Sequence, residues 1–127
     1  MRSWTTRRLS PQSYQRPSRR LGPEAERRVR RHYRLRGYLV LDANARVGRW
    51  ELDLVVRRGR TLVFCEVKAR SGDGFGDPSE AVGQEKARRV EQAALGWLAR
   101  HPELADLDVR FEVAAVRGRR VERLALF

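Results

Sequence analysis

The sequence predicts a mixed α/β domain built around one central sheet. Helical patterns cover residues 23–36 and 77–101, extended apolar runs lie between and after them, and the order is helix, three strands, helix, two strands. With 127 residues, the chain is long enough for one domain with a modest core and too short for two. No apolar run approaches the roughly 20 residues that a membrane helix needs, so we expect no membrane partner.

The first 20 residues are predicted to form a disordered basic tail ahead of a single domain at 21–127. They contain Ser, Thr, Gln, Pro and Arg without apolar periodicity. No apolar segment follows the charged N-terminus, as it would in a secretory signal. Cys65 is the single cysteine, which excludes a disulfide within the chain. We therefore expect a cytoplasmic protein.

The first helix is predicted from its ends and from one apolar stripe. Pro23 fits the first turn, and Gly37 fits the position after the last turn. Ala25, Val29 and Tyr33 recur at helical spacing and form the face that we expect to be buried.

The strands and the second helix follow from alternating apolar patterns and turn residues. Asp77 is suited to cap the second helix, which follows a loop with three glycines. Arg58-Gly59 is predicted to be the tight turn between the second and third strands. The expected strands cover residues 37–44, 49–57, 61–69, 109–116 and 121–127.

Carboxylates interrupt the second and third strands. Pairing across a two-residue turn at 58–59 places Arg57 opposite Arg60, Asp53 opposite Phe64 and Glu51 opposite Glu66. Because side chains alternate along a strand, Glu51, Asp53, Glu66 and Lys68 then share one face, and Cys65 lies on the other. We expect Phe64 to pack under the first helix.

This acidic face favours a divalent cation. Each pair of carboxylates about 5 Å apart costs roughly 3 kcal/mol at an effective dielectric constant of 20, and one lysine cannot neutralise three acids. Mg²⁺, or Mn²⁺ in its place, accepts such hard oxygen ligands. A salt-bridge cluster with arginines is the alternative. Glu26 lies within the inward stripe of the first helix, so it is either a fourth member of the site or the partner of an arginine; we favour the former.

The charge balance indicates a polyanionic partner. The formal net charge is +12, and 26 of the 28 basic residues are arginine. Without the tail, 22 basic and 16 acidic residues still leave +6. Arginine binds phosphate through its bidentate fork, which favours nucleic acid. The alternative is that arginine only keeps the domain soluble.

The motifs "ELDLV", "VFCEVKAR" and "FGDPSEAV", followed by Lys86, are specific in combination. Over residues 21–127 the sequence resembles the small bacterial YraN family, also known as UPF0102. That family resembles the PD-(D/E)XK nucleases, particularly archaeal Holliday junction resolvases. The resemblance implies a restriction-endonuclease-like core with the order α-β-β-β-α-β-β. The family usually has Gly-Glu before its aspartate, whereas this chain has Trp50-Glu51, and Trp50 either narrows the approach or adds a stacking surface.

The resemblance also implies roles for individual residues. Asp53 matches the first acid of the superfamily, and Glu66 and Lys68 match its Glu-x-Lys, with Val67 between them. Asp53, Glu66 and the Val67 carbonyl would hold Mg²⁺ or Mn²⁺, and Lys68 would orient water or stabilise developing charge. The remaining residues carried over are Glu26 and Glu51 as further site acids, and Asn44, Arg46 and Lys86 as contacts to backbone phosphates.

The resemblance suggests a metal-dependent endonuclease that hydrolyses phosphodiester bonds in DNA. Its likeness to junction resolvases suggests branched DNA as substrate and a homodimer as the working form. A non-catalytic nucleic-acid-binding protein on the same fold is the alternative, because a fold alone does not establish turnover. A third interpretation is an interaction protein whose basic surface meets a protein partner.

Overall fold

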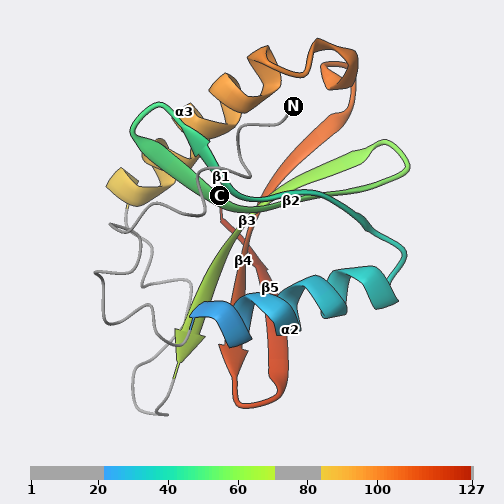
Figure 1. Ribbon diagram of the computed structural model, residues 1–127, viewed down its shortest axis with the longest axis vertical. Coiled ribbons are helices and arrows are strands. Elements are labelled where there is room, and N and C mark those ends of the chain that lie inside the picture. The colour runs from blue at the N-terminus through green and yellow to red at the C-terminus, as the bar shows by residue number, and fades with distance from the viewer. Residues whose placement is uncertain (1–21, 71–83, 127) are drawn as a thin grey trace.

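The computed structural model describes residues 22–70 and 84–126, and it shows a five-stranded sheet between two helices (Figure 1). The spatial order of the strands is β1-β2-β3-β4-β5. Only β3 and β4 are parallel, and the connection between them contains α3, whereas the other neighbours are antiparallel. The strands are β1 (Leu39–Val47), β2 (Trp50–Arg58), β3 (Thr61–Arg70), β4 (Asp108–Arg117) and β5 (Arg120–Ala125).

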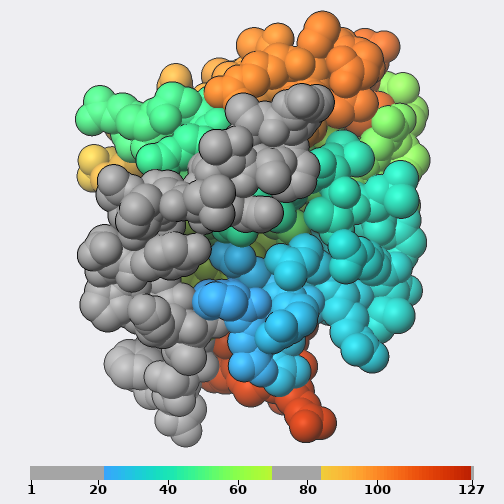
Figure 2. Space-filling model, viewed as in Figure 1, coloured from blue at the N-terminus to red at the C-terminus, as the bar shows by residue number. Residues whose placement is uncertain are grey.

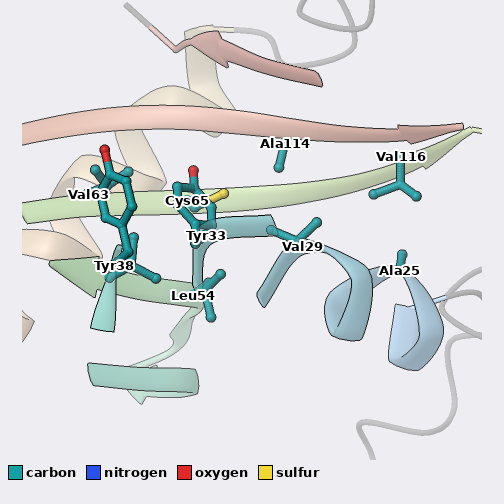
Figure 3. Close-up of a cluster of buried hydrophobic side chains, with 10 residues drawn as sticks. Ala25, Val29, Tyr33, Tyr38, Leu54, Val63, Cys65, Ala114 and Val116 are labelled. Carbon is teal, nitrogen blue, oxygen red and sulfur yellow. The ribbon is translucent and has the colours of Figure 1, made fainter. Parts of the chain in front are cut away.

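Helix α2 (Gly22–Leu35) covers one face of the sheet with the predicted stripe. Ala25, Val29 and Tyr33 are buried. They pack against apolar side chains of β2, β3 and β4, among them Leu54 and Cys65, and Figure 3 shows this cluster between the helix and the strands. Val29 and Tyr33 are fully buried, and a large apolar side chain contributes about 1.5–3 kcal/mol when it is buried in this way, so the stripe fixes α2 on the sheet.

Helix α3 (Gln84–Ala99) covers the opposite face and is followed by the short helix η4 (Pro102–Leu104). Trp97 projects from α3 and is buried against Phe64 of β3, with their ring centroids 5.6 Å apart. The Trp97 Nε1–H donates to Asp42 Oδ2 over 2.9 Å, which ties the helix to β1. Gly96 permits the close approach, because a Cβ there would lie 2.5 Å from Val47 Cγ1.

The predicted fold class and element order are confirmed, but the predicted strand pairing is wrong. The tight turn consists of Gly59 and Arg60, because Arg58 pairs with Thr61. Arg57 therefore lies opposite Leu62 and not Arg60, and Phe64 lies opposite Val55 and not Asp53. The shift is two residues, so side chains of the paired segment keep the face assigned to them. Beyond it β2 changes face, because Leu54 packs with the α2 cluster and Leu52 with the α3 cluster.

Two further expectations about side chains had different outcomes. Phe64 packs under α3 and not under the first helix, since it belongs to the same cluster as Trp97. Cys65 is buried on the opposite face, as predicted. The predicted tail at 1–20, the cap at Asp77 and the glycine loop lie outside the described residues. In the described part of the chain, no helix has the length and apolar character that crossing a membrane requires.

Candidate active site

The candidate active site forms where β2 separates from β3. The described pairing of these strands ends at Leu54 and Cys65, whereas β2 stays paired with β1 as far as Trp50. The end of the β1–β2 hairpin and the end of β3 point in different directions (Figure 1). Beyond Cys65, the edge of β3 that carries the predicted acid Glu66 is therefore no longer paired with β2.

A left-handed residue marks the change in direction. Residues two apart on a strand normally share a face. Ala43 packs with the α2 cluster, but Ala45 packs with the α3 cluster. Asn44 lies between them with φ +52°, a conformation that asparagine tolerates better than most residues. Asn44 therefore turns the hairpin toward α3 and away from β3.

Asp53 occupies the gap that this separation leaves. Its Oδ2 accepts a hydrogen bond from the backbone N–H of Val67 over 2.9 Å. The carboxylate takes the place of the backbone acceptor that a continued ladder would have offered. Asp53 on β2 is thereby fixed beside the Glu-x-Lys segment of β3.

Two more acids approach from different elements. Glu26 projects from α2, and the Asn44 side chain donates from Nδ2 to Glu26 Oε1 over 3.3 Å. Glu66 on β3 is buried, and its Oε2 lies 3.1 Å from Lys86 Nζ of α3. The site thus joins residues from both helices and three strands.

These side chains line a cleft of about 440 Å³. Its lining contains four acids and five basic residues, so a negative centre lies beside a positive border. The lining residues are Gly22, Ala25, Glu26, Arg46, Arg49, Trp50, Glu51, Asp53, Glu66, Val67, Lys68, Ala69, Lys86, Arg89 and Val90.

The acids repel one another in the absence of a cation. Burial raises the pKa of Asp53 well above its ordinary value, the charge of Glu66 raises it further, and the Val67 hydrogen bond opposes both effects. Burial also raises the pKa of Glu26, and the Asn44 hydrogen bond and Arg30 only partly offset it. A bound cation would reverse this cost, because it favours the ionised carboxylates.

The oxygen donors suit Mg²⁺, although they do not form a finished cage. Within residues 22–70 and 84–126, no three His, Cys, Asp or Glu side chains are arranged as a metal site. Mg²⁺ does not require three, since it binds one or two carboxylates and keeps water or phosphate oxygens as its other ligands. Asp53 and Glu66 supply two carboxylates to one cleft, and the charge of Glu66 raises the pKa of Asp53, so the chemistry of the donors fits the ion.

Comparisons with known proteins identify the family. A family model described as "Uncharacterised protein family UPF0102" matches residues 25–116. The chain belongs to the UPF0102 family. A UPF0102 protein of Frankia alni is 49% identical over 96 residues, which cover 76% of this chain and 79% of that protein. A UPF0102 protein of Halorhodospira halophila is 39% identical over 113 residues, which cover 89% of this chain and 90% of that protein.

The structure of this UPF0102 protein brings the predicted site acids together. Asp53, Glu66, Glu51 and Glu26 all line the cleft, as does Lys68. Val67 contributes its N–H to Asp53. The predicted residues therefore meet in one cleft, although not through the predicted pairing, and the cleft is lined from both faces of β3, since Val67 and Ala69 also belong to its lining.

Of the three residues expected to contact phosphate, only Arg46 is an exposed side chain at the border of the cleft. Asn44 binds Glu26, and Lys86 binds Glu66. In this UPF0102 structure both residues hold site acids. Their spacing along the chain gave no indication of these contacts, because each joins separate elements.

Sequence reasoning missed the basic border formed by Arg49 and Arg89. Both guanidinium groups lie over the Trp50 ring, at 5.1 and 5.7 Å from its centroid. Arg89 follows Lys86 by three residues on α3, a spacing that places both on one side of a helix and could have indicated it.

Proposed function

We propose that this protein is a metal-dependent nuclease that hydrolyses phosphodiester bonds in DNA. The observation that carries the proposal is that the carboxylates of Asp53 and Glu66 lie in one cleft, at the point where β2 leaves β3. Two carboxylates of mutually unfavourable charge there share a cleft with Lys68 and an arginine border. This combination suits phosphodiester hydrolysis, since the substrate is anionic and negative charge develops in the transition state.

The roles follow from where the side chains lie. Asp53 and Glu66 would hold Mg²⁺, which when bound lowers the pKa of a coordinated water and polarises the phosphate. Lys68 lies on the same strand as Glu66 and lines the cleft, so its ammonium group would orient the attacking water and stabilise developing charge. Arg46 and Arg89 would bind phosphates on either side of the cleaved bond.

A second candidate function is nucleic-acid binding without cleavage, and one contact favours it. The Lys86 ammonium group already neutralises Glu66 over 3.1 Å. A lysine in this position competes with a cation for the carboxylate. Under the nuclease proposal, Lys86 must leave Glu66 when a metal and a phosphate bind.

The test is a Mg²⁺ and Mn²⁺ titration with labelled duplex, flap, four-way junction and single-stranded DNA. We expect metal-dependent cleavage by the wild type and a loss of at least about 10²–10³-fold in Asp53→Asn and Glu66→Gln. Glu103→Gln is the matched control, because Glu103 is an exposed carboxylate that does not line the cleft. It should cleave like the wild type.

The possible outcomes separate the two functions. Salt-sensitive binding with no cleavage at any metal concentration would favour the binding protein. Cleavage that persists in an Asp53→Asn/Glu66→Gln double variant would disprove the assigned site. Lys86→Met should lower the metal concentration required for half-maximal cleavage if the lysine competes for Glu66.

A further inference from the structure

A second hollow, of about 590 Å³, lies between α2 and the turn that joins β4 to β5. Figure 2 shows the blue and cyan α2 in contact with the red end of the β4–β5 hairpin. We name this hollow the arginine groove. It is lined by Arg28, Arg31, His32, Leu35, Arg36, Arg119, Arg120 and Val121.

The groove carries a concentrated positive charge. Five of its eight lining residues are arginines, and none is an acid. Only Arg28 forms an ion pair with a described residue, to Glu24 over 3.0 Å. Arg36 is held in place, because its guanidinium group donates to the His32 carbonyl over 3.0 Å. Four of the five arginines thus form no ion pair with a described residue, and a cluster of this kind on two separate elements is suited to a ligand that carries several negative charges.

The histidine of the groove responds to this field. Partial burial lowers the pKa of His32, and the nearby charges of Arg36 and Arg123 lower it further. Glu112 acts in the opposite direction but does not restore the ordinary value. A bound anion would raise the pKa of His32, which makes this side chain a reporter of binding.

The arginine groove and the acidic cleft lie on opposite sides of the buried stripe of α2. At 100° per residue, Glu26 lies on one side of Val29, and Arg28 and His32 lie on the other. Along the axis, the groove begins at Arg28, two residues from Glu26, and its far end is Arg36, just past α2 and ten residues, or about 15 Å, from Glu26. One phosphate cannot occupy both places.

We propose that the arginine groove binds the phosphate backbone of duplex DNA at a distance from the bond that is cleaved. This inference rests on the proposed function, because it gives the nuclease a second point of contact with its substrate. Successive phosphates of one strand advance about 3.4 Å along a duplex, so for a duplex that lies along α2 the far end of the groove, about 15 Å from Glu26, corresponds to up to four or five base pairs. A substrate must therefore contain a duplex that continues beyond the cleft.

The first experiment measures binding without cleavage. All proteins carry Asp53→Asn and are titrated in EDTA with a labelled 20-base-pair duplex at several salt concentrations. Arg31→Gln/Arg119→Gln removes two exposed groove charges. The matched control is Arg27→Gln/Arg34→Gln, which removes two exposed arginines from the same helix and touches neither hollow. Circular dichroism confirms that each protein is folded.

We expect the groove variant to bind the duplex about tenfold more weakly, with a salt slope lower by about two, whereas the control stays near the starting protein. Arg31→Lys/Arg119→Lys should recover part of the affinity. The duplex should also raise the pKa of His32 in a nuclear magnetic resonance titration. Equal losses in the groove variant and the control would overturn the proposal, because they would indicate a diffuse charge effect.

Two further comparisons separate the possible causes. If the groove variant loses binding to vesicles of anionic lipid but not to the duplex, the groove is a membrane-binding surface and the proposal is wrong. If the groove variant binds duplex weakly but the wild type cleaves no substrate, the groove proposal stands and the nuclease proposal fails. If the wild type cleaves and the groove variant binds and cleaves equally well, only the groove proposal fails.

Discussion

Glu66 on β3 and Glu112 on β4 are both buried, with 6% and 7% of their surface exposed. They differ in the charged and polar groups that surround their carboxylates. Both Glu112 oxygens are bound: Arg123 donates from Nε to Oε1 over 2.9 Å and from a terminal nitrogen to Oε2 over 3.1 Å. The Tyr33 hydroxyl donates to Oε1 over 2.7 Å. Glu66 has Lys86 as a partner but shares its cleft with three other acids.

The pKa shifts express the same difference. Burial alone would raise the pKa of Glu112, but the hydrogen bonds from Arg123 and Tyr33 outweigh it and hold that pKa below its ordinary value. The pKa of Asp53, beside Glu66, is shifted in the opposite direction by burial and by its acidic neighbours. The carboxylate at Glu112 is fully paired by the fold, whereas in the cleft Lys86 pairs with Glu66 and leaves Asp53 beside acidic neighbours that raise its pKa. This difference distinguishes a structural acid from a candidate catalytic one.

The largest expected effect is on stability. Glu112→Ala should lower the free energy of unfolding by about 3 kcal/mol, because it leaves the Arg123 guanidinium group without its buried partner. Asp53→Asn should change the free energy of unfolding by less than about 1 kcal/mol, since it removes repulsion and keeps an oxygen for the Val67 N–H. Urea unfolding of both variants tests the contrast. A stability loss in Asp53→Asn equal to that in Glu112→Ala would contradict it.

The second prediction concerns the pH dependence of the Glu112–Arg123 pair. A carboxyl group with a lowered folded-state pKa stabilises the protein fully above the unfolded value of about 4.3, and this contribution is lost as the pH falls through the folded value. The difference in unfolding free energy between the wild type and Glu112→Gln should be large at pH 7 and shrink below pH ~4. A difference that grows toward acid pH would show that the sign is wrong.

The sequence could predict local features of the molecule but not which distant side chains bind each other. Local patterns gave the helices and strands to within a few residues, as at α2 and β3. They also gave the acids that meet in the cleft, because a register error of two residues leaves the side chains of the paired segment on their own side of the sheet. The pair of Glu112 and Arg123 was not predicted, because nothing in a strand pattern shows which of many arginines a buried carboxylate will bind.

The separation of β2 from β3 was also beyond the sequence. It depends on Asn44, whose left-handed backbone turns the hairpin and whose side chain holds Glu26. Asparagine is common in turns and at the ends of strands, so its presence at position 44 did not predict a left-handed backbone conformation. Backbone strain of this kind is concentrated at functional sites, which supports a role for Asn44 in shaping the cleft.

The third prediction separates the backbone role of Asn44 from its side-chain role. Asn44→Gly keeps the left-handed conformation but removes the donor to Glu26, so we expect near-normal stability and cleavage lower by about tenfold. Asn44→Ala loses the donor and adds about 1 kcal/mol of backbone strain. Thermal unfolding and cleavage rates measured together test this. Equal stability of the Gly and Ala variants would show that the backbone conformation has no cost.

The smallest effect is expected at an ion pair that resembles the Glu112 pair in distance but not in burial. Arg28 lies 3.0 Å from Glu24 on the surface of α2. The side chain of Glu24, taken without its backbone, is 62% exposed, whereas the side chain of Glu112 is 9% exposed. Water already solvates both groups of the surface pair, so Glu24→Gln should lower the unfolding free energy by only about 0.3–0.5 kcal/mol, and less in high salt. Urea unfolding in low and high salt measures this change beside Glu112→Ala. Comparable losses in the two variants would mean that burial does not set the strength of these pairs, and the distinction between the neutralised acid and the cleft acids would lose its physical basis.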